Sequence, residues 1–463
     1  MKKSTQSALP SEPFAAWSPT KAEPFGRKWA GHLLRRLCLG ATEAELDAAE
    51  QAGPAKTLDA LFDFDPADDA LKQQADSLVG FINFGDTRQV QEWWVHRMLF
   101  GKPLQERMAL FWHNHFATSH TKVGGERMHL QIRLFRRLGM GSFRELLIEI
   151  GKDPAMLVWL DGHGSHKNAP NENYAREVME LFSLGTGSYT EDDVKELSRC
   201  FTGWRAGRDE SYFDKNRFDD GEKHVHGMRG AFDAETVVDV LLAQPAAPRF
   251  IAAKLLREFV HPEPPAEAVT HYAARLKHHN WHIGPVLREM VSSNLFYSAF
   301  AYRSRIKMPA ELVLGSVKAL GGRVQARFCR EQLEKMGQDL LNPPDVSGWD
   351  GGEAWINANT VLVRFNFGLE VSRQRGNYYV KGERLHQLIR DAKLKTAEDV
   401  VDHYAALLLD GEIRPDARSK LVDYMNRNEK NEPAPFKPDG NGINNKVRGV
   451  IHLMTALPDY QLA

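Results

Sequence analysis

The chain has 463 residues, which is more than one small hydrophobic core needs and is typical of two or three folding units. Hydrophobic residues make up 42% and charged residues 26%, a composition that excludes a disordered, collagen-like or coiled-coil protein. The 60 basic and 61 acidic side chains give a formal net charge of −1. No overall field therefore attracts nucleic acid or an anionic membrane, and we expect a globular protein with no nucleic-acid partner.

The N-terminal sequence and the small number of cysteines favour a cytoplasmic location. Residues 1–25 contain two early lysines but no apolar stretch typical of a signal peptide, so we expect a flexible N-terminal segment. Cys38, Cys200 and Cys329 are too few and too scattered for a disulfide framework, which fits a reducing compartment. No uncharged stretch approaches the roughly 18 residues that a membrane-spanning helix requires.

Apolar residues recur at helical spacing along most of the chain, so the fold class is predicted to be mainly α, a multi-helical globular protein. Pro103 suits a first helical turn, and the apolar stripe from Leu104 to His115 predicts a buried helix. A second helix is expected to begin near Asn173 and to end at Gly185. Thr190 and Asp193 form a capping box that opens the next one. Further helices are expected at 233–243, 246–260, 265–278, 284–293, 309–320, 330–338, 356–373, 384–391, 396–409, 414–427 and 446–456.

The least helical section is 205–231, where we expect at most a minor β-hairpin. Polar segments at 374–384 and 428–446 have the composition of linkers or long loops. The first of them predicts a boundary between a main helical body at 26–373, which carries the polar motifs, and a C-terminal helical subdomain at 374–463.

Two parts of the chain share a pattern of residues. The run that starts at Thr236 resembles the run that starts at Asp399, and Met290 corresponds to Met454 at a similar offset. The pattern is typical of a duplicated helical unit, with 396–463 as a pseudo-repeat of 233–300. Chance similarity between amphipathic helices explains it equally well.

A first polar cluster lies at Trp112–Phe116. His113 and His115 are two positions apart on the predicted helix, so their side chains point about 200° from each other and cannot bind one ion together from mid-helix. Each is a candidate proton carrier or metal ligand. The alternative for each is a buried histidine with one hydrogen-bond partner.

A second polar cluster runs from Asp161 to Glu180. Glu172, Arg176 and Glu180 are spaced four residues apart, which is typical of a surface ion-pair ladder. Alternatively, Glu177 and Glu180 lie beside the apolar stripe, where burial raises the pKa of a carboxyl group and suits it to act as a general base. These two carboxylates are close enough on a helix to share a cation.

A divalent metal is therefore a candidate cofactor. Its ligands would be Glu180 together with His115 and His163, with nitrogen and oxygen donors in the mixture that transition metals accept. The spacing lacks the motifs of di-iron bundles and zinc peptidases. His224 and His226 would lie on the same side of an extended strand, a second chelating arrangement that is also common on protein surfaces.

Several motif classes are absent from the sequence: the phosphate-binding loop, the dinucleotide-binding glycine pattern, the nucleophile elbow and paired Cys-x-x-Cys. ATPases, Rossmann oxidoreductases and α/β-hydrolases are therefore disfavoured. Tryptophans instead stand among turn-forming residues at 201–204, 342–349 and 355–359. Trp204 and Trp349 can form the wall of a substrate site, or they can anchor these loops to the body.

The sequence resembles a bacterial family known as "domain of unknown function 1800". The resemblance is carried by stretches in order along the chain, most specifically by the Asn-Glu-Asn-x-x-Arg-Glu-x-x-Glu-Leu-Phe string at 171–182 and by the Asn-Pro-Pro-x-Val-x-Gly-Trp string at 342–349. The other stretches are 32–42, 106–119, 156–170, 183–204, 250–260, 306–315, 336–341 and 354–367. The resemblance implies a predominantly helical protein and brings no established reaction.

The same resemblance suggests a partner. Relatives often occur beside genes for "domain of unknown function 1501", a family similar to phosphatases and sulfatases, and many relatives are exported. The chain is thus a candidate maturation or binding partner of such a protein, and export remains an alternative to a cytoplasmic location.

Three functions remain open from the sequence. The first is an enzyme that hydrolyses or oxidises a polymeric or peptidic substrate. It would use Glu177 or Glu172 as base, His113 as proton carrier and Arg176 to orient an anionic group, with Asn171 and Asn173 contacting the substrate. The second is the noncatalytic partner, in which the polar clusters are buried hydrogen-bond networks. The third is a glycan-binding protein that uses the tryptophan-bearing loops.

Overall fold

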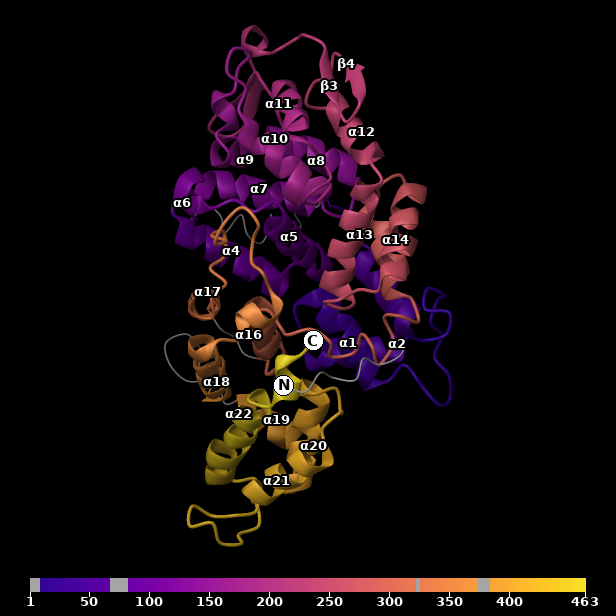
Figure 1. Cartoon of the computed structure of the whole chain (residues 1–463). Helices are drawn as coiled ribbons and strands as arrows, with labels where there is room; N and C mark the ends of the chain where they lie inside the picture. The colour runs from indigo at the N-terminus through magenta and orange to yellow at the C-terminus, as the bar shows by residue number, and fades with distance from the viewer. Residues whose placement is uncertain (1–8, 67–81, 322–324, 374–383) are drawn as a thin grey trace.

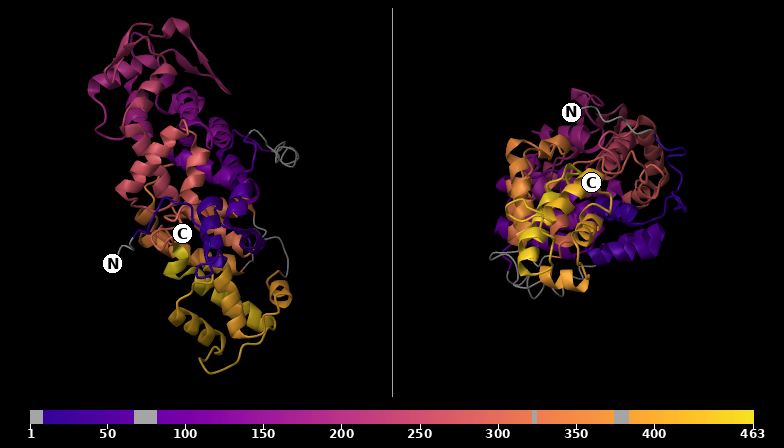
Figure 2. Two further views of the ribbon diagram at one scale, coloured as in Figure 1. Left: turned by 90° about the vertical axis from the view of Figure 1, so that its right-hand side faces the viewer. Right: turned by 90° about the horizontal axis from the view of Figure 1, so that it is seen from below.

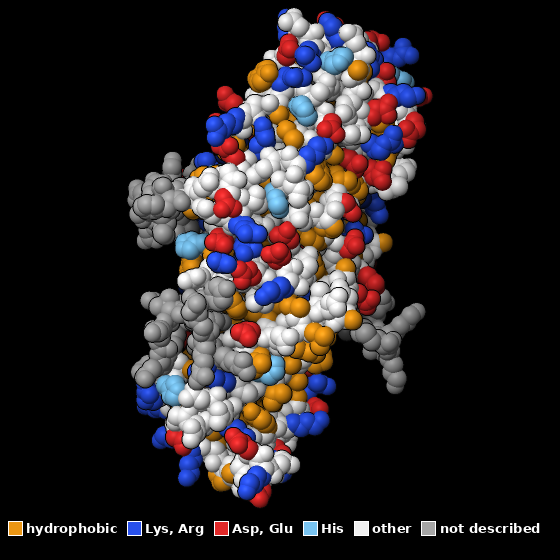
Figure 3. All heavy atoms as spheres, turned by 90° about the vertical axis from the view of Figure 1, so that its left-hand side faces the viewer, with side chains coloured by type: hydrophobic (Ala, Val, Ile, Leu, Met, Phe, Trp, Pro, Cys, Tyr) orange, Lys and Arg blue, Asp and Glu red, His pale blue; other side chains and the backbone are white. Residues whose placement is uncertain are grey.

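The computed structural model describes residues 9–66, 82–321, 325–373 and 384–463. Over these residues the fold is mainly helical with two small antiparallel sheets of two strands each, which confirms the predicted fold class. The helices stack into an elongated molecule that carries the β-hairpins at one end and the C-terminal helices at the other (Figures 1 and 2). Acidic and basic side chains are interspersed on the face shown in Figure 3, in keeping with the near-zero net charge.

The first half of the chain builds the upper and central parts of the molecule in Figure 1. Its helices are α1 (Arg27–Cys38), α2 (Glu43–Phe62), α4 (Thr87–Phe100), α5 (Pro103–His115), α6 (His120–Val123), α7 (Gly125–Leu138), α8 (Phe143–Lys152), α9 (Pro154–Trp159), the 3₁₀-helix η1 (Gly162–Gly164), α10 (Glu172–Glu177), the π-helix η2 (Val178–Ser183) and α11 (Glu191–Cys200).

Helix α5 runs through the centre of the molecule. Pro103 occupies its first turn, as predicted, but the helix is buried on every side rather than along one stripe. The buried side chains include the charged Glu106 and Arg107. A buried charge is costly unless it is paired, so the position of α5 requires ionic partners from neighbouring helices.

The helix predicted from Asn173 to Gly185 changes its winding. It begins as α10, with Asn171 as N-cap, and continues after Glu177 as η2. Gly185 follows with φ 89° and donates its backbone N–H to Met179 O, so the predicted glycine end is confirmed. The capping box of Thr190 and Asp193 at the start of α11 is confirmed as well.

Four short strands lie in the section predicted to hold a minor hairpin. They are β1 (Trp204–Ala206), β2 (Ser211–Phe213), β3 (Lys223–Val225) and β4 (Met228–Gly230), with the 3₁₀-helix η3 (Lys215–Arg217) between the pairs. His224 lies in β3, whereas His226 has φ 48° and forms the turn to β4 with Gly227. The expectation that these two histidines share one side of a strand is therefore wrong, because the turn begins between them.

The second half of the chain continues downward in Figure 1 from the α13–α14 pair to the C-terminal helices. Its α-helices lie within a few residues of the predicted bounds: α12 (Thr236–Ala243), α13 (Ala246–Phe259), α14 (Ala266–His278), α15 (Ile283–Val291), α16 (Pro309–Ala319), α17 (Ala326–Lys335), α18 (Ala358–Arg373), α19 (Arg384–Asp391), α20 (Ala397–Leu408), α21 (Pro415–Met425) and α22 (Arg448–Thr455). The sequence did not predict the short helices η4 (Gly352–Trp355) and η6 (Pro458–Gln461), nor the π-helix η5 (Gly442–Val447) at the end of the expected loop 428–446.

The expected boundary at 374–383 lies outside the described residues. The two runs with a shared pattern lie on α12 and α15 and on α20 and α22, and their common origin stays a prediction.

Part of the N-terminal segment that we expected to be flexible contacts the body. Trp17 stacks on Tyr297 with 4.3 Å between ring centroids, and its backbone N–H donates to Ser292 O at 2.8 Å. Ala16 forms an antiparallel bridge with Ser293. Residues 13–17 are thereby held beside the end of α15, while residues 1–8 lie outside the described chain.

In the described residues, no helix is both long enough and apolar enough to cross a membrane. Cys38, Cys200 and Cys329 are buried and unpaired, and burial raises the pKa of each thiol to about 12.

Asp153 makes the stability of the central helices depend on pH. This N-cap residue of α9 accepts hydrogen bonds from Met156 N at 2.9 Å and from Gln131 Nε2 at 2.8 Å. Burial outweighs both bonds and raises the pKa of Asp153 to about 6. Because the folded-state pKa is above the unfolded value of 3.8, the stability that protonated Asp153 contributes is present below about pH 4 and is lost as the pH rises through 6.

We expect Asp153→Asn to remove this dependence. The wild type should lose up to roughly 3 kcal/mol of unfolding free energy relative to the variant between pH 4 and pH 7, at about 1.4 kcal/mol per pKa unit. Urea unfolding at the two pH values measures the difference. Asp86→Asn, at the less buried N-cap of α4, is the control. A wild-type-minus-variant difference that stays constant with pH would contradict this account.

Candidate functional site

A cleft of about 620 Å³ lies beside α5 and α13 and is large enough for a small ligand or a segment of a chain. One wall is the C-terminal half of α5 and the end of α13. The opposite wall is the loop of residues 347–355, which carries Trp349 and Trp355. Residues 304–308 and Gln338 complete the lining. We call this opening the central cleft.

Asn114 holds the tryptophan loop against α5. Its Oδ1 accepts a hydrogen bond from Trp349 N at 2.6 Å, and its Nδ2 donates to Trp349 O at 3.4 Å. Gly348 has φ 89°, and a Cβ at this position would meet Asn114 O at 2.3 Å. A glycine is therefore required, because both the left-handed backbone and the close approach exclude a side chain. The two stretches that contain Asn114 and Gly348, far apart in sequence, meet here.

Below the cleft lies a buried network of charges centred on Arg107. Its Nη2 lies 2.8 Å from Glu258 Oε1 and 2.7 Å from Glu311 Oε1, and its Nε donates to Arg36 O at 3.2 Å. Arg305 lies 3.3 Å from the same Glu311 oxygen and 3.8 Å from Glu258. Burial acts to raise the pKa of Glu311, but Arg305 and Arg107 together outweigh it and hold that pKa below its usual value. Two carboxylates thus balance two guanidinium groups.

The α13 wall of the cleft adds two cations that this network does not neutralise. Lys254 and Arg257 are three residues apart and so are neighbours on the helix surface. In the part of the chain that the structure describes, neither forms an ion pair with a carboxylate. Lys254 Nζ lies 5.5 Å from the centroid of the Phe250 ring. Burial, and next the charge of Arg257, lowers the pKa of Lys254.

His115 lines the same wall. Its Nε2 lies 3.0 Å from Phe182 O, in the last turn of η2, where the carbonyl has no helical donor. This contact places the proton on Nε2 and leaves Nδ1 unprotonated, without a partner among the described residues. Burial, and then Lys254, lowers the pKa of His115, so the imidazole is neutral at physiological pH.

His113 lies behind the tryptophan loop, on the other side of α5. The imidazole is fully buried between Trp94 and Trp349, each with its ring centroid 5.5 Å away. Neither ring nitrogen has a partner among the described residues, and burial lowers the pKa to about 3. The separation of the two histidines by α5 agrees with the helical geometry expected from the sequence.

The acidic cluster of 171–180 lies elsewhere, around α10 and η2. Arg176 forms two 2.8 Å bonds with Glu191 of α11 and lies 3.7 Å from Glu172. Glu180 accepts a hydrogen bond from Tyr189, so the expected ladder stops after its first pair. Asn171 Oδ1 caps α10 by accepting from Asn173 N at 2.8 Å. Asn171, Arg176 and Glu180, which were predicted site residues, therefore bind neighbours within this cluster or at the start of α11.

Glu177 differs from its neighbours. It is half-buried, and burial followed by repulsion from Glu180 raises the pKa of its carboxyl group, as the sequence predicted. In the described residues, no hydrogen bond or ion pair connects Glu177, Glu172 or Glu180 to His113 or His115. The described residues thus show no direct bond between the imidazoles and the carboxylates of the predicted site, and their joint action stays a prediction.

The two remaining predicted residues also lie apart from the central cleft. His163 Nδ1 lies 3.1 Å from Leu157 O, within the η1 turn. Trp204 begins β1, packs on Phe213 at 5.4 Å and lies below Lys152 Nζ at 5.3 Å. Of Trp204 and Trp349, only Trp349 lines the cleft, together with Trp355 from the third tryptophan-bearing stretch.

Residues 9–66, 82–321, 325–373 and 384–463 contain no group of three or more His, Cys, Asp or Glu side chains arranged to hold a metal ion. In particular, His115, His163 and Glu180 bind to separate partners. The candidate metal ligands are thus not brought together within the described chain.

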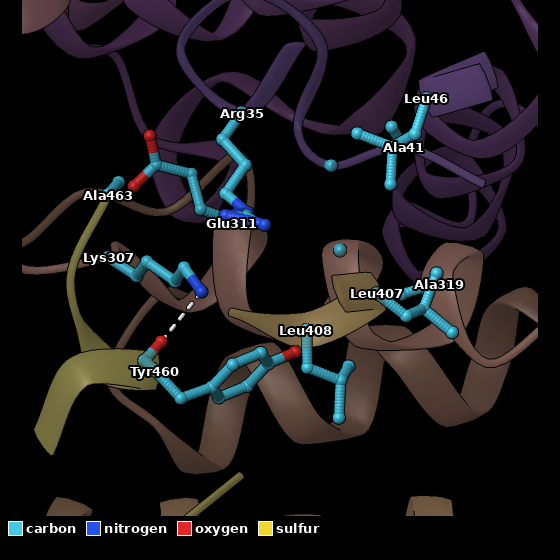
Figure 4. Close-up of a pocket in the computed structure, with 12 residues that line it drawn as sticks. Arg35, Ala41, Leu46, Lys307, Glu311, Ala319, Leu407, Leu408, Tyr460 and Ala463 are labelled. Carbon is cyan, nitrogen blue, oxygen red and sulfur yellow. Dashed lines mark hydrogen bonds between the residues drawn. The ribbon is translucent and has the colours of Figure 1, made fainter. Parts of the chain in front are cut away.

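A second, smaller cavity lies between α1, α16 and the C-terminal helices (Figure 4). Its volume of about 20 Å³ has room for roughly one water molecule. Lys307 donates to Tyr460 O at 2.6 Å beside it, and Arg35 binds Asp410 at 2.6 Å nearby. Burial, and then the charge of Arg35, lowers the pKa of Lys307 well below its usual value. This cavity joins the C-terminal helices to α1 and is too small for a ligand.

Sequence reasoning missed most of the cleft. Lys254, Arg257 and Glu258 stand at i, i+3 and i+4 of one helix, so the sequence could have shown that these three charged residues share one helix face. Arg305 and Asp350 gave no such signal, since each reaches the cleft from an irregular segment.

A family model described as "Protein of unknown function (DUF1800)" matches residues 32–462. No curated protein and no solved structure matches the chain.

The network around Arg107 predicts a large loss of stability when one carboxylate is removed. Glu311→Gln leaves two buried guanidinium groups with one carboxylate, and we expect it to cost about 3–5 kcal/mol of unfolding free energy. Asp402→Asn, which breaks the exposed pair with Arg418, should cost at most about 1 kcal/mol. Chemical denaturation of both variants measures the difference. Equal and small losses would show that the network does not stabilise the fold.

Proposed function

The chain belongs to the DUF1800 family of proteins of unknown function, and we propose that it is an enzyme whose active site is the central cleft. Its substrate is a peptide or another polar polymer, a segment of which lies between α13 and the tryptophan loop. The reaction is a hydrolysis or an oxidation.

The distribution of charge across the cleft is the observation that carries this proposal. The α13 wall carries Lys254 and Arg257 beside Glu258, which is paired with Arg107, and the loop carries the acidic Asp350 and Glu353. Trp349 and Trp355 of the loop also line the cleft. Opposite charges beside flat apolar rings fit a chain segment that carries both charged and apolar groups.

Catalysis rather than simple binding is supported by the protonation states on the α13 and α5 wall. Burial lowers the pKa of both His115 and Lys254, which favours the neutral imidazole and the free amine, the forms that act as bases or nucleophiles. Perturbed groups of this kind in a ligand-sized cleft are typical of active sites. Glu177, whose carboxyl pKa is raised, does not line the central cleft.

Two exposed cleft residues give the sharpest test. We expect Arg257→Ala and Asp350→Ala each to raise KM by roughly tenfold, since a hydrogen bond to a charged group contributes about 1.5–3 kcal/mol. Folding should be unaffected, because surface substitutions usually change stability by less than about 0.5 kcal/mol. The measurement is release of label from fluorescent casein and from a panel of dyed polysaccharides.

Arg249→Ala, on the exposed side of the same helix two turns earlier, is the matched control and should retain wild-type kinetics. Loss of turnover in Glu177→Gln, with normal turnover in both cleft variants, would instead assign the active site to the 171–180 cluster. No turnover of either polymer class by the wild type would reject the proposed substrate.

A further inference from the structure

Lys254 is a half-buried cation for which the described residues supply neither a carboxylate nor a hydrogen-bond acceptor, whereas the buried Lys223 and Lys307 donate to backbone carbonyls. Arg107 and Arg305 are each within 4 Å of a carboxylate, whereas Lys254 is without one in the described residues and lies over the Phe250 ring. A lysine beside an aromatic ring and without a counter-ion loses part of the stabilisation of its ammonium form, which favours the free, nucleophilic amine. Because Lys254 lines the central cleft, that amine faces space that a ligand can enter.

Arg257 places a second positive charge in the cleft, next to Lys254. It is exposed, lines the cleft three residues after Lys254, and has no carboxylate partner in the part of the chain that the structure describes. Two neighbouring cations without a counter-ion repel each other, and an anionic ligand would relieve this repulsion. Arg305, which is nearly buried, lies on the same lining and shares its carboxylates with Arg107.

We propose that Lys254 is a nucleophile that captures a carbonyl compound bearing an anionic group, such as a 2-oxo acid or an acidic aldehyde, and that Arg257 binds the anion. The inference rests on the proposed function in placing this chemistry in the central cleft, and it names the reactive group of the ligand.

The covalent step balances without any further reactant. The amine nitrogen of Lys254 attacks the carbonyl carbon, a C–N bond forms, and the π bond to oxygen breaks. Both amine hydrogens leave with that oxygen as water, and a C=N bond joins the ligand to the lysine. The product is an imine, which cyanoborohydride converts into a stable secondary amine by giving hydride to carbon while solvent protonates nitrogen.

Trapping with glyoxylate and cyanoborohydride tests the proposal on the full chain. We expect one carboxymethyl group per chain at Lys254, found by peptide mass mapping, and formed severalfold faster at pH 7 than at the exposed Lys420. Lys254→Arg, which keeps the charge, should abolish this fast labelling. Lys420→Arg is the matched control and should leave it unchanged. Labelling in proportion to exposure, with Lys254 no faster than Lys420, would overturn the proposal.

Arg257→Ala separates capture of the carbonyl from binding of the anion. Capture of glyoxylate should fall about tenfold more than capture of the uncharged acetaldehyde, because acetaldehyde loses only the effect of Arg257 on the pKa of Lys254, whereas glyoxylate also loses a charge-assisted contact. An equal effect on both probes would overturn the assignment of the anion to Arg257.

The outcomes for the two proposals are distinguishable. Polymer turnover that persists without any trapping at Lys254 would overturn the carbonyl inference and leave the proposed function standing. Selective trapping at Lys254 in a protein that turns over neither polymer class would overturn the proposed function and leave the carbonyl inference standing.

Discussion

Four distant parts of the chain depend on the position of one guanidinium group. Arg107 of α5 binds Glu258 of α13, Glu311 of α16 and the backbone of α1 at Arg36, all within 3.2 Å. Burying such a charge is favourable only when its partners are in place, so helices α1, α13 and α16 must pack around α5 together. The same packing sets the end of α13 opposite the tryptophan loop. The position of the cleft therefore depends on the ion pairs of the Arg107 guanidinium group with Glu258 and Glu311.

The cations around the central cleft differ in their partners. Arg107 and Arg305 are paired with the carboxylates of Glu258 and Glu311, which holds their guanidinium groups in place. Lys254 borders a cleft without such a match, and its pKa is lowered as a result of burial and of Arg257. A paired arginine contributes to the fold, whereas an unpaired lysine beside open space is available to a ligand.

The helices were largely predictable from the sequence, while the site was not. The period of apolar residues, the capping box at Thr190 and the glycine end at Gly185 are local features, and each is confirmed. The grouping of His113, His115, Glu177 and Arg176 into one site required tertiary contacts that local spacing does not contain. Asn114 and Trp349 lie 235 residues apart, yet their hydrogen bonds shape the cleft.

The sequence by itself determined the helical fold class, the near-neutral surface and the family, because these follow from composition, periodicity and contiguous motifs. The tertiary structure alone decided which polar residues are structural. Arg176 and Glu191 form an exposed ion pair, and His115 caps the carboxyl end of η2. Lys254, Arg257 and Glu258 of α13 form a charged wall of the central cleft. The physical reason is that burial and pairing, which fix the protonation state and the accessibility of a side chain, depend on neighbours from remote segments that no local pattern specifies.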